Sequence, residues 1–105
     1  MVLIPCSDEI LDLEAISPSV DTAKVAGTPA AILFNCVSPR SAMLEAAQHT
    51  VKRYGTQIVP FVVAQRTIFG RALIAGQTAQ ELDPTSKAAE DIQQLYNWCI
   101  QALDK

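Results

Sequence analysis

The stretch AAILF, residues 30–34, stands between the turn-forming residues Gly27, Thr28 and Pro29 and the sequence NCVSPR at 35–40. All five of its residues are apolar, and an unbroken apolar run of this length between turn-forming residues is typical of a strand covered on both faces. Two other runs, at 2–4 and 58–63, have nearly the same character. We therefore predict that these three ranges are strands of one parallel sheet.

Helical patterns lie between the three runs. Residues 10–26 carry apolar residues at helical spacing, and Ser17 followed by Pro18 predicts a break and a restarted helix. Ser38 and Pro39 repeat this start signal. We therefore predict a second helical region that begins at this pair and ends near Gly55.

Two more helices are predicted after the third run. The first covers 67–75 and ends at Gly76, and the second follows the turn-forming residues Asp83, Pro84 and Ser86. Pro5 is expected to end the first strand. The order β-α-β-α-β-α-α indicates an α/β fold, a small three-layer structure of about three parallel strands with helices on both faces. We expect residues 1–105 to form a single domain.

Composition limits the classes of function. Half of the residues are hydrophobic and 18% are charged, as in ordinary globular proteins. The net charge of -3 does not favour nucleic-acid binding by the surface as a whole, although a local basic patch is compatible with it. No apolar run approaches the roughly 20 residues of a membrane span. We expect a cytoplasmic protein without a membrane partner.

The cysteines do not form a recognisable framework. Cys6, Cys36 and Cys99 are widely spaced, and His49 is the single histidine of the sequence. This pattern lacks the paired spacing of disulfide-rich domains and zinc sites. We predict reduced, mostly buried thiols and no metal site, and we expect His49 to be a solvated residue on its helix.

Polar residues follow each predicted strand, and ligands of open parallel sheets bind beyond the carboxyl ends of the strands. Polar loops also occur at this edge in domains without a ligand there, so the pattern alone leaves both interpretations open. A small enzyme that uses one of the cysteines at this edge is a further alternative. The residues are Cys6 and Ser7, then Asn35 and Cys36, then Ala64, Gln65 and Arg66.

The segment GRALIAGQT, residues 70–78, is not a phosphate-binding loop. Five residues separate its glycines where the motif has four, and Gln77 occupies the position of the essential lysine. A predicted helix also precedes Gly76, where the motif requires a strand. We therefore interpret Gly76 as a helix cap.

Taken in order, several segments resemble the C-terminal half of ParA-type partition ATPases, relatives of MinD in the P-loop superfamily. The resemblance covers nearly all of the chain and rests on the ordered set of segments. The segments are VLIPCS with LDLEAI, AAILFNCVSPRS, YGTQIVPFVVAQR, AGQTAQELDP and SKAAEDIQQLYNW.

The resemblance implies a nucleotide site. Asn35 is similar to the family residue that hydrogen-bonds adenine, and the loop Ala64, Gln65 and Arg66 is similar to the one that closes over the base. An asparagine amide has the donor and the acceptor that this edge of adenine requires. The family has proline where this chain has Ala64. ATP and magnesium are the cofactors implied for the complete family protein.

Some relatives bind DNA without sequence preference through basic residues near these loops. Arg40, Arg66 and Arg71 are the corresponding candidates here, because phosphate contacts require only such point charges. The resemblance therefore implies weak, non-specific DNA binding.

The family's N-terminal half carries a glycine-rich loop with two lysines and a strand with the aspartate associated with magnesium. Neither is found in this sequence, so we expect a fragment, a truncated product or a small descendant that does not hydrolyse ATP by itself and needs no cofactor alone. The implied function of the complete protein is plasmid or chromosome partition. The alternative is a stand-alone interaction module that pairs with itself or with a full-length ParA-like protein, and we predict a homodimer formed through the strand at 2–4.

Overall fold

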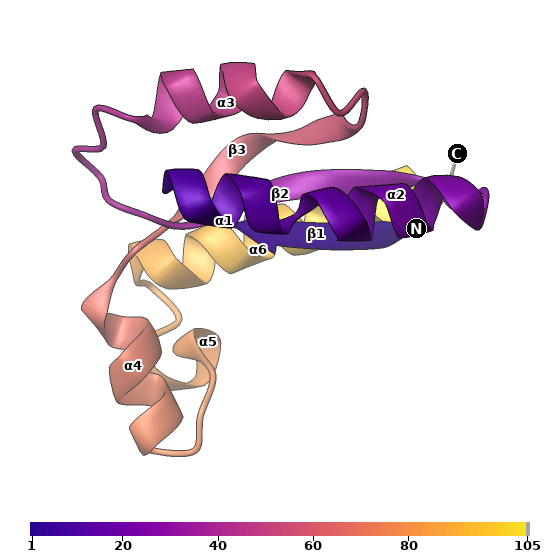
Figure 1. The fold of residues 1–105 in the computed structure, drawn as a ribbon. Coiled ribbons are helices and arrows are strands. Elements are labelled where there is room, and N and C mark those ends of the chain that lie inside the picture. Colours follow the sequence, from indigo (N-terminus) through magenta and orange to yellow (C-terminus); the bar gives the residue numbers. More distant parts are fainter. Residues whose placement is uncertain (105) are drawn as a thin grey trace.

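The computed structural model describes residues 1–104. Three strands and six helices alternate along this part of the chain (Figure 1). In chain order they are β1 (Val2–Cys6), α1 (Ile10–Ala15), α2 (Ser17–Val25), β2 (Ala30–Val37), α3 (Leu44–Lys52), β3 (Gln57–Ala64), α4 (Thr67–Ile74), α5 (Ala79–Leu82) and α6 (Lys87–Leu103).

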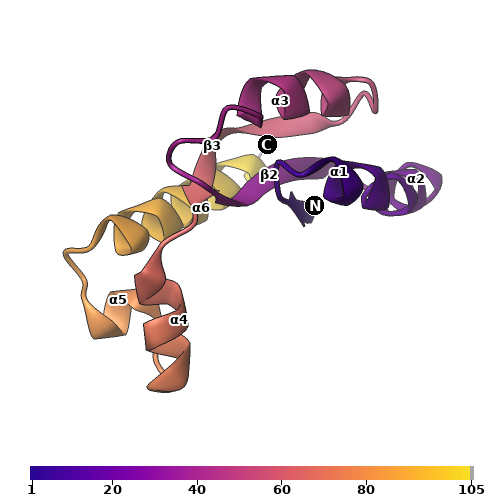
Figure 2. The ribbon, with the colours of Figure 1, turned by 60° about the vertical axis from the view of Figure 1, so that its left-hand side comes forward.

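The three strands form one parallel sheet in the order β1-β2-β3, so β2 is the central strand and the other two are edges. One core cluster joins the sheet to α1, α2 and α3, with Phe34 and Ile32 fully buried in it. A second cluster, which includes Leu33 and Val63, joins the opposite face to α6. The predicted α/β fold with helices on both faces is confirmed (Figures 1 and 2).

The first strand continues past Pro5 to Cys6, so the prediction that Pro5 ends it is wrong. The N–H of Val2 donates to the carbonyl of Pro29 at 2.8 Å, which directs the backbone groups of Val2 toward β2. Backbone groups of successive strand residues alternate in direction, so Pro5 faces away from β2. The N–H that proline lacks is therefore not needed for pairing with β2.

The third helix begins at Leu44, six residues after Ser38, so the predicted start is wrong. Ser38 forms a turn instead, because its carbonyl accepts from the N–H of Ser41 at 3.0 Å and its Oγ from the N–H of Arg40 at 3.4 Å. Both partners lie within three residues. The serine–proline pair thus closes a loop and caps no helix.

The break between the first two helices, the cap at Gly76 and the start of the last helix are confirmed. Helix α1 ends and α2 begins around Ile16, and Gly76 follows α4 with a φ of 68° that favours glycine. Ser86 caps α6, with its Oγ accepting from the N–H of Ala89 at 3.1 Å.

A short helix, α5, was not predicted. Thr78 and Glu81 form a capping box around its first turn, each side chain accepting from the other residue's N–H. Helices α4 and α5 together project away from the sheet as an arm (Figures 1 and 2). Leu73 and Ile74 are largely exposed at the end of α4. No helix within residues 1–104 combines the length and the apolar character needed to cross a bilayer.

Candidate ligand edge of the sheet

The carboxyl ends of the three strands meet at one edge, as expected for parallel neighbours. Cys6 lies opposite Phe34, Asn35 lies opposite Val63, and Val37 lies opposite Ala64. Asn35 and the residues that follow β3 therefore occupy adjacent strand ends.

Strand β2 is irregular where it reaches this edge. Its register with β3 shifts between Asn35 and Val37, and Cys36 has a φ of 56°, in the left-handed region. Such a bulge redirects the side chains beside it. The carbonyl of Val37 accepts from the N–H of Gln65 at 2.7 Å, so the loop after β3 is tied to the end of β2.

A groove of about 580 Å³ opens beside the edge strand β1. Near the carboxyl end of β1, the groove is lined by Asn35, Cys36, Cys6, Ser7 and Asp12. Ala64, Gln65 and Arg66 are not among its lining residues. The predicted adenine-side residues thus lie on neighbouring strand ends, but Asn35 is the one member of this set that lines the groove.

Side-chain hydrogen bonds fix the loops around the groove. The hydroxyl of Ser7 donates to the Asp12 carboxylate, and the hydroxyl of Ser41 donates to Asp8. The Ser41 bond joins the loop after β1 to the loop after β2. The two acidic side chains at the start of α1 therefore serve as acceptors within the fold.

Cys6 is buried, and its environment disfavours the thiolate. Burial, and secondarily the nearby charge of Asp12, raise the pKa of Cys6 from its usual 9.0 to about 11. Nucleophilic chemistry needs the thiolate, so Cys6 is a poor nucleophile near neutral pH. Cys36 is exposed and Cys99 is partly buried, so the expectation of mostly buried thiols holds only for Cys6 and Cys99.

Two of the three candidate DNA-binding arginines belong to one segment, because Arg66 is the N-cap of α4 and Arg71 lies within that helix. Arg66 forms an ion pair with Asp91 of α6 through its Nε at 3.0 Å, and both side chains are largely covered. Arg71 lies on α4 near Asp83, whose pKa is lowered by hydrogen bonds from Thr85 and by Arg71. Arg40 lies in the exposed turn after β2.

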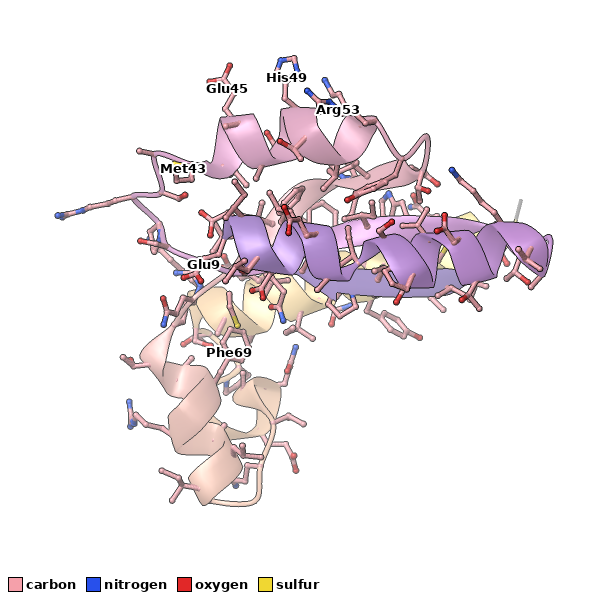
Figure 3. All side chains as sticks on the ribbon, in the orientation of Figure 1. Glu9, Met43, Glu45, His49, Arg53 and Phe69 are labelled. Atoms are coloured by element: carbon pink, nitrogen blue, oxygen red, sulfur yellow. The ribbon has the colours of Figure 1, made fainter. Side chains whose placement is uncertain are left out.

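His49 is exposed on the outer side of α3 and points away from the sheet beside Glu45 and Arg53 (Figure 3). This confirms that it is a solvated residue. Within residues 1–104, no group of three or more histidine, cysteine, aspartate or glutamate side chains is arranged to hold a metal ion.

Sequence reasoning missed the partners that anchor this edge. Asp91 lies 25 positions from Arg66, and Ser41 lies 33 positions from Asp8, so no local spacing indicates either pair. The Ser7–Asp12 pair spans five positions around the start of a helix and could have been found as a local loop contact.

No sequence profile of a known protein family matches the chain. Among curated proteins, the chain is similar to the "maintenance of carboxysome distribution protein A" of Halothiobacillus neapolitanus, with 30% identity over 94% of this chain and 49% of that protein. The chain thus spans about half the length of the curated relative it matches. This similarity supports a distant relation to ParA-like proteins.

Proposed function

We propose that the chain is the adenine-side portion of a ParA-like positioning ATPase and does not hydrolyse ATP by itself. The observation that carries the proposal is the similarity of nearly the whole chain to a protein named for the distribution of carboxysomes. The segments that resemble ParA-type partition ATPases point to the same class of activity, the placement of a large cargo in the cell. Plasmids, chromosomes and carboxysomes are all cargoes of suitable size.

The geometry of the sheet edge is compatible with an adenine contact. Asn35 is half-buried near the end of β2. The N–H of Gln65 donates a hydrogen bond to the carbonyl of Val37, which holds the loop after β3 beside Asn35. The ion pair between Arg66 and Asp91 anchors that loop to α6. An amide held beside an anchored loop can donate to and accept from one edge of a base.

Phosphate chemistry has no evident support within the sequence. None of the 105 residues belongs to a glycine-rich loop that ends in lysine, which is the element that cradles phosphates in P-loop proteins. We therefore expect the chain to release no phosphate from ATP above the buffer rate and to bind ATP weakly at most. Calorimetry that detects micromolar, magnesium-dependent ATP binding by this chain would contradict the proposal.

The adenine contact can be tested with adenosine, which lacks phosphates. In a nuclear magnetic resonance titration of the labelled chain, we expect weak binding with amide shifts centred on Asn35, Gln65 and Arg66. Asn35→Ala should weaken it about five- to tenfold, the effect of losing one or two hydrogen bonds. Asn97→Ala, an exposed asparagine on α6, is the matched control. Shifts centred elsewhere, or an unchanged affinity of Asn35→Ala, would refute the adenine assignment.

We also propose a weak, sequence-independent contact with DNA. Arg40 is the best candidate of the three arginines, because Arg66 is paired with Asp91 and Arg71 lies near Asp83. Arg40→Ala should lower affinity equally for unrelated DNA sequences and reduce the salt slope by about one. Arg53→Ala, an exposed position at the C-cap of α3, is the matched control (Figure 3). Fluorescence anisotropy across a salt series measures both quantities, and a sequence preference or salt-independent binding would contradict this role.

A further inference from the structure

The arm formed by α4 and α5, residues 67–82, is bounded by one extended residue at each end. Arg66, the N-cap of α4, has a φ of -138° and a ψ of 140°, and Asp83, the C-cap of α5, has a φ of -151° and a ψ of 94°. Hinges are commonly a few residues at the ends of helices or strands. The N–H of Gln65 donates to the carbonyl of Val37 at 2.7 Å, so the backbone is fixed to the sheet immediately before Arg66. Arg66 and Asp83 are therefore the points at which the arm can turn.

The arm holds its own shape through contacts within it. The N–H of Gln77 donates to the carbonyl of Ala72 at 2.8 Å and closes the turn after α4. Thr78 and Glu81 close the first turn of α5 with their capping box. Within the arm, which lies wholly in the described part of the chain, the two buried residues are Ala72 on α4 and Ala79 on α5. The two helices can therefore move together as one body.

Two polar contacts attach the arm and its first hinge to α6. The Nε of Arg66 pairs with the Asp91 carboxylate at 3.0 Å, and the Nε2 of Gln80 donates to the carbonyl of Ala89 at 3.1 Å. Phe69 is partly buried and packs against the core cluster on the same face of the sheet. Both polar contacts end on the first half of α6, so they act at one place.

The packing between the arm and α6 is incomplete. A hollow of about 350 Å³ is lined by residues of both, namely Thr78, Gln80, Ile92, Gln93 and Tyr96. Protein interiors are close-packed and contain few voids larger than a water molecule. Segments that bury little apolar surface open at a lower free energy than the core does. The arm is therefore the part of the fold that should separate from α6 most easily.

We propose that the arm is a hinged unit that swings away from α6, with the Arg66–Asp91 ion pair and the Gln80–Ala89 hydrogen bond as its latch. The position drawn in Figures 1 and 2 is the latched state. In the open state the arm keeps both helices and loses the two latch contacts. Opening leaves no charge buried, because the side chains of Arg66 and Asp91 are already 27% and 18% exposed in the latched state. Opening also releases the guanidinium of Arg66 at the candidate ligand edge.

This proposal does not depend on the proposed function and is tested by the orientation of the arm relative to the sheet. Residual dipolar couplings of the backbone amides measure how strongly each segment is aligned with the rest of the molecule. The double variant Asp91→Ala with Gln80→Ala removes both latch contacts and should favour the open state about a hundredfold, about tenfold for each contact. From a minor population of about 1%, the arm should then be open about half of the time. Its alignment should fall well below that of the sheet, whereas α6 should stay aligned with the sheet.

The matched control is Glu90→Ala with Gln94→Ala, two exposed positions on α6. In this control the arm should stay aligned with the sheet. In the double variant, the couplings of α4 and α5 should still fit one common orientation, because the arm moves as a unit. An arm that stays aligned with the sheet in the double variant overturns the proposal, and so does a control that loosens the arm equally. Couplings of the arm that no longer fit one orientation also overturn it, because the segment would then unfold instead of turning on a hinge.

Discussion

Phe34→Ala should lower the free energy of unfolding by about 3–5 kcal/mol. Phe34 lies in the central strand β2 with 0% exposure and belongs to the cluster that joins the sheet to the first three helices. Truncation removes a large apolar surface and leaves a cavity. The surrounding backbone cannot collapse into it, because β2 is hydrogen-bonded on both sides.

Urea unfolding followed by circular dichroism measures this loss. Phe61→Ala is the matched control, because Phe61 lies on the edge strand β3 and is only partly buried. We expect the control to cost less than Phe34→Ala, with the same dependence on urea concentration. A cost of Phe34→Ala below about 1.5 kcal/mol would show that β2 is not the centre of the core.

Between pH 9 and 11, the chain should lose stability as a direct result of the buried Cys6 thiol. The folded pKa of Cys6 is raised to about 11 from its usual 9.0. Below pH 9 the thiol is protonated in both the folded and the unfolded states, and its stabilising effect is complete. As the pH rises through this range, the unfolded state releases the proton first, so stability falls. About two pKa units set an upper bound of about 2.7 kcal/mol, which solvent screening at the groove reduces.

Cys6→Ala removes this titration and isolates it from the other groups that titrate at high pH. Between pH 9 and 11, the free energy of unfolding should fall more for the wild type than for Cys6→Ala. Between pH 6 and 8, it should change with pH to the same extent in both. Cys36→Ala is the matched control, because Cys36 is exposed. If the wild type and Cys6→Ala lose stability equally above pH 9, the thiol is not buried as described.

The strands and most helices could be predicted, because continuous apolar runs and helical spacing are local properties of the sequence. The errors arose where one residue has two uses. Proline ends a central strand, but on an edge strand such as β1 it can point its missing donor outward. A serine before proline caps a helix, but Ser38 closes a turn with the N–H of Ser41. Only the three-dimensional arrangement decides between these uses.

The candidate ligand edge could be predicted as a set of strand ends, because parallel strands always bring their carboxyl ends together. The detailed geometry of this edge could not be predicted. The left-handed conformation of Cys36 and the bond between Gln65 and Val37 depend on a register shift that sequence patterns do not encode. The pairing of Arg66 with Asp91 depends on where α6 crosses the sheet. The arginine that is least engaged within the fold, Arg40, therefore became the better DNA candidate only with the structure.

Within residues 1–104, both outer strands of the sheet carry a proline, and this bears on how such sheets associate with one another. Pro5 lies on β1, and Pro60 lies in the part of β3 where the register with β2 shifts. Growth of a continuous intermolecular sheet would require both outer strands, β1 and β3, to pair with neighbouring molecules. A junction at β1 would meet the missing donor of Pro5, which faces away from β2. Amyloid-type growth through these strands is therefore expected to be slow even at high protein concentration.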